Sequence, residues 1–264
     1  MVTNSNFNFR RNEIITLELP FSEHIAELRQ RILFIFVTIS CLTIIAFLEV
    51  KNIVKTLEYP INNVRFFQNS PGEYFISTIK ISFYTGLLFT GPFSISQIIL
   101  FLLPGLTKKE AKLILPLVIC SSSLFGMGVV FSYYILIPAA LSFFLNYSQE
   151  VIEPFWSFDE YFEFILVFFY STGISFQIPI IQTVLGVSNI FSVYQMLKAW
   201  KYVILFATIL GAILTPSTDP ITQSVFSIAI LTLYFAGLCF VYLLKKERIY
   251  ISKISKKISK YLSF

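Results

Sequence analysis

The chain is 264 residues long; 56% of its residues are hydrophobic, only 13% are charged, and the formal net charge is +5. Soluble domains carry about 25% charged residues, so this composition excludes an ordinary soluble protein. Together with a mean hydropathy of +0.74, it predicts an all-α polytopic membrane protein. There is one histidine, and the three cysteines lie in separate apolar stretches. We therefore expect no metal, no cofactor and no nucleic-acid partner.

The N-terminal segment, residues 1–31, is polar and ends with "HIAELRQR". Its first part lacks the apolar core of a secretory signal, so no removable signal is expected. The second part predicts an interfacial helix, because apolar residues recur at helical spacing: Phe21, Ile25, Leu28 and Ile32. Glu27 then points away from this apolar face, toward water or a ligand. It can also pair with Arg31, one helical turn further on.

Six apolar stretches are candidates for membrane spans, since a bilayer core about 30 Å thick needs about 20 apolar residues in a helix. We predict spans at residues 32–48, 81–103, 113–136, 162–187, 202–214 and 221–244. The fifth is short, so it must thin the bilayer locally or rest on neighbouring helices. Pro179 predicts a kink or an early end in the fourth.

Several helix starts are marked in the sequence. Three carry the capping-box pattern, a Ser or Thr followed three residues later by Glu: Ser70/Glu73, Thr107/Glu110 and Ser157/Glu160. A fourth has Pro220 at the first helical position behind Asp219. These signals support the predicted order of spans.

The distribution of basic residues predicts that both termini lie on the cytoplasmic (cis) side, an N-in/C-in topology. The segments assigned to that side hold Arg10, Arg11, Arg29, Arg31, Lys108, Lys109, Lys112, Lys198, Lys201 and the lysine-rich tail. The opposite loops hold only Lys51, Lys55 and Arg65. The chain is predicted to be one domain, 1–264, made of the segment 1–31, six spans within 32–244 and a basic tail, 245–264. That tail either forms an amphipathic helix on an anionic leaflet or has no regular structure.

The motifs of catalysis are missing from the sequence. There is no P-loop pattern, and the single histidine lies outside the spans, so an enzyme is not expected. Ion-coupled transporters usually carry buried acids in mid-membrane, whereas the predicted spans offer mainly Gln177 with serines and threonines. A small-molecule or ion transporter and a membrane assembly factor remain the alternative functions.

Two acids, Glu27 and Glu110, are predicted to lie on the same membrane side, each beside the entrance of a span. Two carboxylates at a partly dry interface suit a ligand with two guanidinium groups, because the planar guanidinium can bind a carboxylate through two parallel bonds. Each acid also has a plain structural explanation. Glu27 can pair with Arg31 on a solvated helix face, and Glu110 can complete a capping box.

The sequence resembles the TatC family, the multispanning signal-peptide receptors of twin-arginine protein translocation. The resemblance is carried in order by "HIAELRQR", "ILFLLPGLTKKE", "SSSLFGMGVVFSYYILIPAAL", "YSTGISFQIP" and "LTPSTDPITQ". It implies that Glu27 and Glu110 bind the arginine pair of a signal peptide, with Arg29 in the same motif and Phe101 at another position that the family marks. It also marks four positions as structural or partner-docking: Pro60, Gln177, Asp219 and Gln223. For Asp219 and Gln223, capping of the sixth helix is the favoured explanation.

The resemblance further implies an oligomeric complex in the bilayer with single-span TatA- and TatB-type subunits, driven by the proton-motive force. Six helices can surround only a narrow lumen, so this chain alone is too small to conduct folded cargo. Many bacterial relatives have an acid where this chain has Gln177, which bonds across helices or docks a partner helix. This difference and the bias toward Phe, Ile, Asn and Lys, which suggests an AT-rich genome, favour a plastid thylakoid protein with its termini in the stroma over a bacterial inner-membrane protein.

Overall fold

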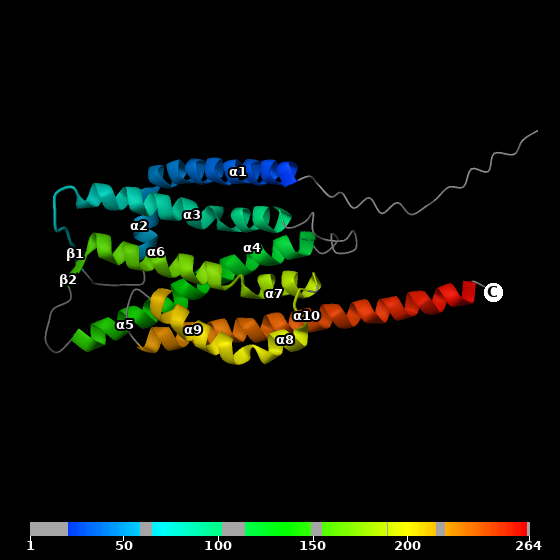
Figure 1. Ribbon diagram of the computed structural model, residues 1–264. Coiled ribbons are helices and arrows are strands. Elements are labelled where there is room, and N and C mark those ends of the chain that lie inside the picture. The colour runs from blue at the N-terminus through cyan, green and yellow to red at the C-terminus, as the bar shows by residue number, and fades with distance from the viewer. Residues whose placement is uncertain are drawn as a thin grey trace, which may run out of the picture.

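The computed structural model describes residues 21–58, 65–101, 114–148, 155–188, 190–214 and 220–262. The predicted all-α class is confirmed, because helices make up nearly all of the described residues (Figure 1). The helices are α1 (Phe21–Leu48), α2 (Val50–Glu58), α3 (Glu73–Phe101), α4 (Ile114–Phe131), α5 (Ile137–Ser148), α6 (Phe158–Ser175), α7 (Ile178–Val187), α8 (Val193–Lys198), α9 (Trp200–Leu214) and α10 (Pro220–Leu262). A π-helical turn, η3 (Ser132–Leu136), joins α4 to α5.

Within the described residues, five helical stretches are long and apolar enough to cross a membrane. They are Ile25–Leu48, Glu73–Phe101, Leu115–Tyr147, Phe158–Val187 and Pro220–Lys245. A sixth stretch, Trp200–Ile213, is apolar but shorter, and it coincides with the predicted short fifth span. The chain is a membrane protein, and its number of spans remains a prediction.

The long helices alternate in direction, as expected for a chain that passes back and forth. Figure 1 shows that α1 begins, α3 ends, α4 begins and α7 ends at one end of the bundle, which we call the near end. The second half of α10 projects from the same end and continues to Leu262, so the basic tail is helical. At the opposite end, the far end, α1 finishes and α3 and α6 begin.

Several predicted boundaries need correction. The segment predicted as an interfacial helix is the first part of α1, which continues without a break to Leu48. The third span does not stop at residue 136, because η3 carries the helix into α5. In that turn the Ile137 N–H donates to the Ser132 carbonyl, five residues back. A π-turn of this kind lets the chain accommodate Pro138, which has no N–H to donate.

The predicted break at Pro179 is confirmed. Helix α6 ends at Ser175 and α7 begins at Ile178, so that Pro179 falls within the first turn of the new helix. A proline there costs little, because the first N–H groups of a helix have no intrahelical partner. Phe176 and Gln177 are left between the two helices, close to the middle of the predicted fourth span.

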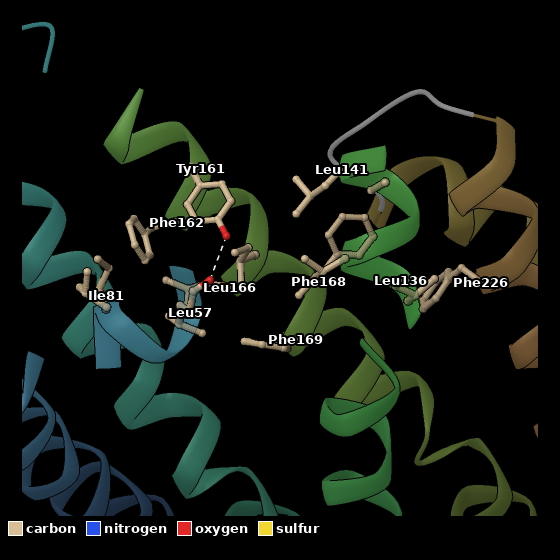
Figure 2. Packing of buried hydrophobic residues seen from close by; sticks show 14 of the residues in the cluster. Leu57, Ile81, Leu136, Leu141, Tyr161, Phe162, Leu166, Phe168, Phe169 and Phe226 are labelled. Carbon is tan, nitrogen blue, oxygen red and sulfur yellow. Dashed lines mark hydrogen bonds between the residues drawn. The ribbon is translucent and has the colours of Figure 1, made fainter. Parts of the chain in front are cut away.

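The far end contains the one sheet among the described residues, which the sequence did not predict. Strand β1 (Arg65–Phe67) pairs in parallel with β2 (Phe155–Ser157), with Phe66 opposite Trp156. Phe66 packs on the ring of Tyr161, with 5.0 Å between ring centroids. The Tyr161 hydroxyl donates to the Leu57 carbonyl of α2 at 2.9 Å (Figure 2). These contacts attach α2 and both strands to α6.

Helix α6 forms the centre of the hydrophobic core. Its residues Phe162, Leu166, Phe168 and Phe169 pack with side chains of neighbouring elements in one continuous cluster (Figure 2). Two of the candidate spans lie at the extremes of burial: 61% of the most apolar part of Phe158–Val187 is buried inside the protein, and only 6% of that of Ile25–Leu48. An apolar helix that is buried all round marks the middle of a bundle, whereas α1 lies at its edge.

Candidate functional site

The near end of α1 carries a compact polar cluster of three residues, Glu27, Arg31 and Gln97. The Arg31 guanidinium donates to Glu27 Oε1 from Nε at 3.0 Å and from Nη2 at 2.5 Å. Its third nitrogen, Nη1, donates to Gln97 Oε1 of α3 at 2.9 Å. Arg31 therefore links the first turns of α1 to the last turns of α3.

This cluster confirms the predicted Glu27–Arg31 pair but corrects the predicted environment of Glu27. The Glu27 side chain is 28% exposed and that of Arg31 22%, so the pair is half-buried rather than solvated. The apolar face, with Ile25 at 50% and Ile32 at 55% exposure, points outward instead. The reason is the solvent: next to a bilayer, apolar side chains face the lipid, and the polar face of α1 turns toward α3.

Phe101 lies one turn beyond Gln97 on the same face of α3. Because α1 and α3 run in opposite directions, Glu27 and Phe101 are each one turn nearer the near end than the Arg31–Gln97 contact. The structure thus places Glu27 and Phe101 at the same level. Arg29 is exposed on α1. Glu110, Pro60 and Asp219 lie outside the described residues.

Gln177 is buried, with 5% exposure, at the break between α6 and α7. Its Oε1 accepts a hydrogen bond from the Ser121 hydroxyl at 2.7 Å, and its Nε2 donates to the Ser121 carbonyl at 3.2 Å. Both bonds cross to α4. The side chain therefore joins two helices in the interior, as a polar group does where water is absent.

Gln223 contacts the neighbouring helix α9, and its predicted role in capping the start of α10 is shared with Asp219, which lies outside the described residues. Its Nε2 donates to the Thr208 carbonyl of α9 at 3.2 Å. One turn further along α10, the Ser227 hydroxyl donates to the Ala207 carbonyl at 3.2 Å. The two side chains form a polar seam between α9 and α10.

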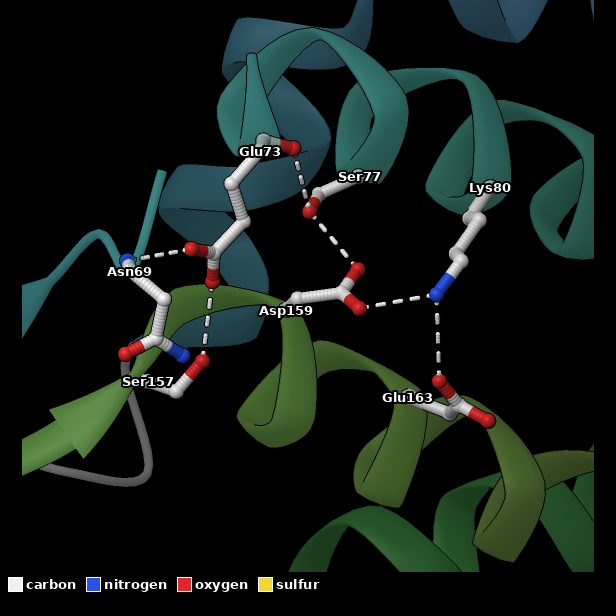
Figure 3. Close-up of polar contacts among 7 residues, drawn as sticks. All are labelled: Asn69, Glu73, Ser77, Lys80, Ser157, Asp159 and Glu163. Carbon is white, nitrogen blue, oxygen red and sulfur yellow. Dashed lines mark hydrogen bonds and ion pairs between the residues drawn. The ribbon is translucent and has the colours of Figure 1, made fainter. Parts of the chain in front are cut away.

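A second polar cluster, at the far end, was missed by the sequence analysis (Figure 3). Lys80 Nζ lies 2.8 Å from Asp159 Oδ2 and 3.3 Å from Glu163 Oε2. The Ser77 hydroxyl donates to Asp159 Oδ1 at 2.7 Å. The available signal was a lysine within an apolar helix, together with two acids four residues apart on another helix.

The capping predictions at this cluster hold only in part. Glu73 accepts from the backbone N–H of Ser70 at 3.3 Å, as the box at Ser70/Glu73 predicts. It also accepts from the backbone N–H of Asn69 (Figure 3). The box at Ser157/Glu160 is wrong. Ser157 makes no capping bond to α6, and its hydroxyl donates to Glu73 Oε1 at 2.9 Å instead. The Ser157 hydroxyl thus bonds to a residue of another helix instead of capping the helix that follows it.

Three further observations concern groups outside these clusters. Gln182 of α7 is 6% exposed, and neither its Oε1 nor its Nε2 has a hydrogen-bond partner among the described residues. No group of His, Cys, Asp and Glu in the described part of the chain is arranged to hold a metal ion. Cys41, Cys120 and Cys239 are free thiols.

The sequence is similar to a known family and to several known proteins. Residues 23–229 match the family model described as Sec-independent protein translocase protein (TatC). The chain is 69% identical to a TatC-like protein, ycf43, of Trieres chinensis over 93% of either protein. It is 46% identical to the chloroplastic Sec-independent protein translocase protein TATC of Pisum sativum, over 83% of this chain and 63% of that protein.

The fold is also similar to a solved structure. A crystal structure described as the twin arginine translocase receptor TatC in DDM matches with a TM-score of 0.75 at 32% sequence identity. The match covers 82% of this chain and 98% of the crystallised one.

Proposed function

This chain belongs to the TatC family, and from that premise we propose that it is the receptor subunit of a twin-arginine translocase. It binds the signal peptides of folded precursor proteins and works within a translocase complex. The members of this family are components of a protein translocase and not enzymes. The polar cluster at the near end of α1 is the observation that carries the proposal, because it places a carboxylate where a cationic peptide can reach it.

In this proposal, Glu27 and Glu110 bind the two arginines of the signal peptide. Glu27 is half-buried beside α3, where a charge-assisted hydrogen bond contributes about 1.5–3 kcal/mol, more than on a fully solvated surface. Glu110 belongs to the segment that joins Phe101 to Ile114, and both of those residues lie at the near end. Phe101, level with Glu27, and the exposed Arg29 complete the proposed binding surface.

The proposed topology is N-in/C-in with six spans, the short α9 being the fifth. The near end then faces the cytoplasmic side, or the stroma if the protein lies in a plastid thylakoid membrane. The alternation of helix directions and the basic residues near the ends of the chain support this orientation. The chloroplastic relative supports the thylakoid over a bacterial inner membrane.

The proposed partners are single-span TatA- and TatB-type subunits, in an oligomeric complex powered by the proton-motive force. A ring of these few helices is too narrow for a folded domain, so other subunits must form the pathway. We assign Gln177 and Gln223 to internal helix joining, which their bonds to Ser121 and Thr208 support. Pro60 and Asp219 are proposed as structural or docking positions from the family resemblance alone.

The test is crosslinking of a precursor that carries a photoreactive group beside its arginine pair. We expect Glu27→Gln and Glu110→Gln to reduce crosslinking strongly while the receptor remains inserted in the membrane. Glu23→Gln is the matched control, because Glu23 is an exposed acid one turn earlier on the same helix. Undiminished crosslinking in the Glu27/Glu110 double variant would refute the proposed site.

A further inference from the structure

Arg31 already holds the carboxylate that the proposed function assigns to an incoming arginine. Two of its nitrogens, Nε and Nη2, donate to the same oxygen of Glu27, Oε1. The other oxygen, Oε2, accepts no hydrogen bond from any residue that the structure describes. A guanidinium most often binds a carboxylate through both oxygens, so this arrangement leaves half of the acceptor open.

We propose that Arg31 is a specificity-determining residue, an internal guanidinium that occupies Glu27 in the empty receptor and is displaced by an arginine of the signal peptide. This inference rests on the proposed function and names how the same site selects its ligand. The incoming guanidinium first contacts the open Oε2 and then takes over Oε1. The reaction is an exchange of one guanidinium for another, with no covalent step.

The exchange avoids the main cost of binding at a half-buried acid. A carboxylate without a partner in such a place loses the hydration that it has in water and gains nothing in return. While Arg31 is present, Glu27 is paired both before and after the signal peptide arrives. Arg31 also keeps a hydrogen-bond partner, because Gln97 Oε1 still accepts from its Nη1 after Glu27 is released.

The same contact predicts that lysine is a poor substitute for arginine in the ligand. A competitor must replace the two hydrogen bonds that Arg31 makes to Glu27, and an arginine presents two N–H groups in one plane. The ammonium of lysine is a compact and strongly hydrated charge, which gains less from a single carboxylate oxygen. Arg31 therefore increases the interaction free energy that a cation must supply in order to bind Glu27. Arginine can supply more of it than lysine can.

The experiment measures binding of a fluorescent twin-arginine peptide, and of its twin-lysine counterpart, to the full-length protein in nanodiscs. We expect Arg31→Gln to bind the arginine peptide about tenfold more tightly, the scale of one charge-assisted hydrogen bond set free. The lysine peptide should gain more, so that discrimination between the two peptides falls. Unchanged or weaker binding of the arginine peptide, or unchanged discrimination, would overturn the inference.

Two further variants control for charge and for folding. Lys51→Gln removes one positive charge from an exposed position on α2, at the far end. It should not change the affinity for the arginine peptide or for the lysine peptide. Arg31→Lys keeps the charge but cannot hold Glu27 and Gln97 together, so it should show a smaller gain. If Arg31→Gln aggregates, Arg31→Lys decides: tighter binding with reduced discrimination supports the exchange, and weaker binding refutes it.

Glu27→Gln separates failure of this inference from failure of the proposed function. If that variant binds the arginine peptide normally, Glu27 is not the binding residue and the proposed site falls with everything built on it. If Glu27→Gln loses binding while Arg31→Gln also loses it, the site stands. Arg31 then supports binding, and the exchange is wrong.

Discussion

Lys80 of α3 lies 2.8 Å from Asp159 of α6, and this ion pair joins two helices whose paired residues are 79 positions apart in the sequence. Glu163, one turn further along α6, is a second and weaker partner at 3.3 Å. Asp159 also accepts from the Ser77 hydroxyl, so its two oxygens are both bound (Figure 3). The far ends of α3 and α6 are thus held together by charge as well as by apolar packing, since the rings of Tyr74 and Phe158 also pack there, with 5.3 Å between their centroids.

The first prediction concerns the two acids that share Lys80. The Asp159 side chain is 26% exposed and that of Glu163 51%, so solvent screens Glu163 more. In double-mutant cycles with Lys80→Met, we expect a coupling of about 1 kcal/mol for Asp159→Asn and at most a few tenths for Glu163→Gln. Thermal unfolding in detergent provides the measurement. Equal couplings would contradict the assignment of Asp159 as the principal partner.

The second prediction compares two glutamines that are buried to the same degree. Gln177 exchanges two hydrogen bonds with Ser121, and Gln182 has no partner among the described residues. Gln177→Leu should destabilise the protein by about 0.6–2 kcal/mol, because the bonds between helices are lost. Gln182→Leu should be neutral or stabilising by about 1 kcal/mol, because it removes an unsatisfied buried amide. The shift in Tm measures both, and a large loss at Gln182 would indicate a partner for its amide.

The third prediction concerns the hydroxyl of Tyr161, which joins α6 to the last turn of α2 (Figure 2). Leu57 is near the C-terminus of α2, where carbonyl groups lack partners within the helix. Tyr161→Phe leaves that carbonyl unsatisfied in a buried place and should cost about 1 kcal/mol of stability. Tyr147→Phe, at a residue that is 82% exposed, is the matched control and should have no effect. Identical Tm values for both variants would show that the bond does not contribute.

The sequence predicts the cores of the long helices well, because hydropathy reports directly on the lipid that surrounds them. It predicts their ends poorly. Helix α3 begins at Glu73, eight residues before the predicted span, since the amphiphilic turns that carry Ser77 and Lys80 are held by contacts to α6. The pair β1 and β2 is only three residues long on each side, too short for alternation to be recognised.

In the candidate site, the contact within one helix could be predicted from the sequence and the contact between two helices could not. The spacing of Glu27 and Arg31 predicts their pairing, since side chains four residues apart meet on a helix. Gln97 is 66 residues from Arg31, and no local pattern indicates that contact. The outward direction of Ile25 has no separate signal in the sequence, because burial in a soluble protein and exposure to lipid demand the same apolar residue.

The last prediction tests how α1 is held at the edge of the bundle, where α3 is its main neighbour. Gly86 of α3 lies directly against Thr43 of α1, and a Cβ at Gly86 would meet the Thr43 Cα at 2.9 Å. Backbone in that position cannot move aside without shifting the whole helix, so Gly86→Ala should separate α1 from α3. Cysteine crosslinking between the two helices provides the readout, and its yield should fall severalfold.

Gly126→Ala is the matched control, because nothing lies within 4 Å of its added Cβ, and alanine favours a helix by about 0.8–1 kcal/mol over glycine. Full crosslinking in the Gly86→Ala variant would mean that the close contact between these helices does not determine where α1 sits.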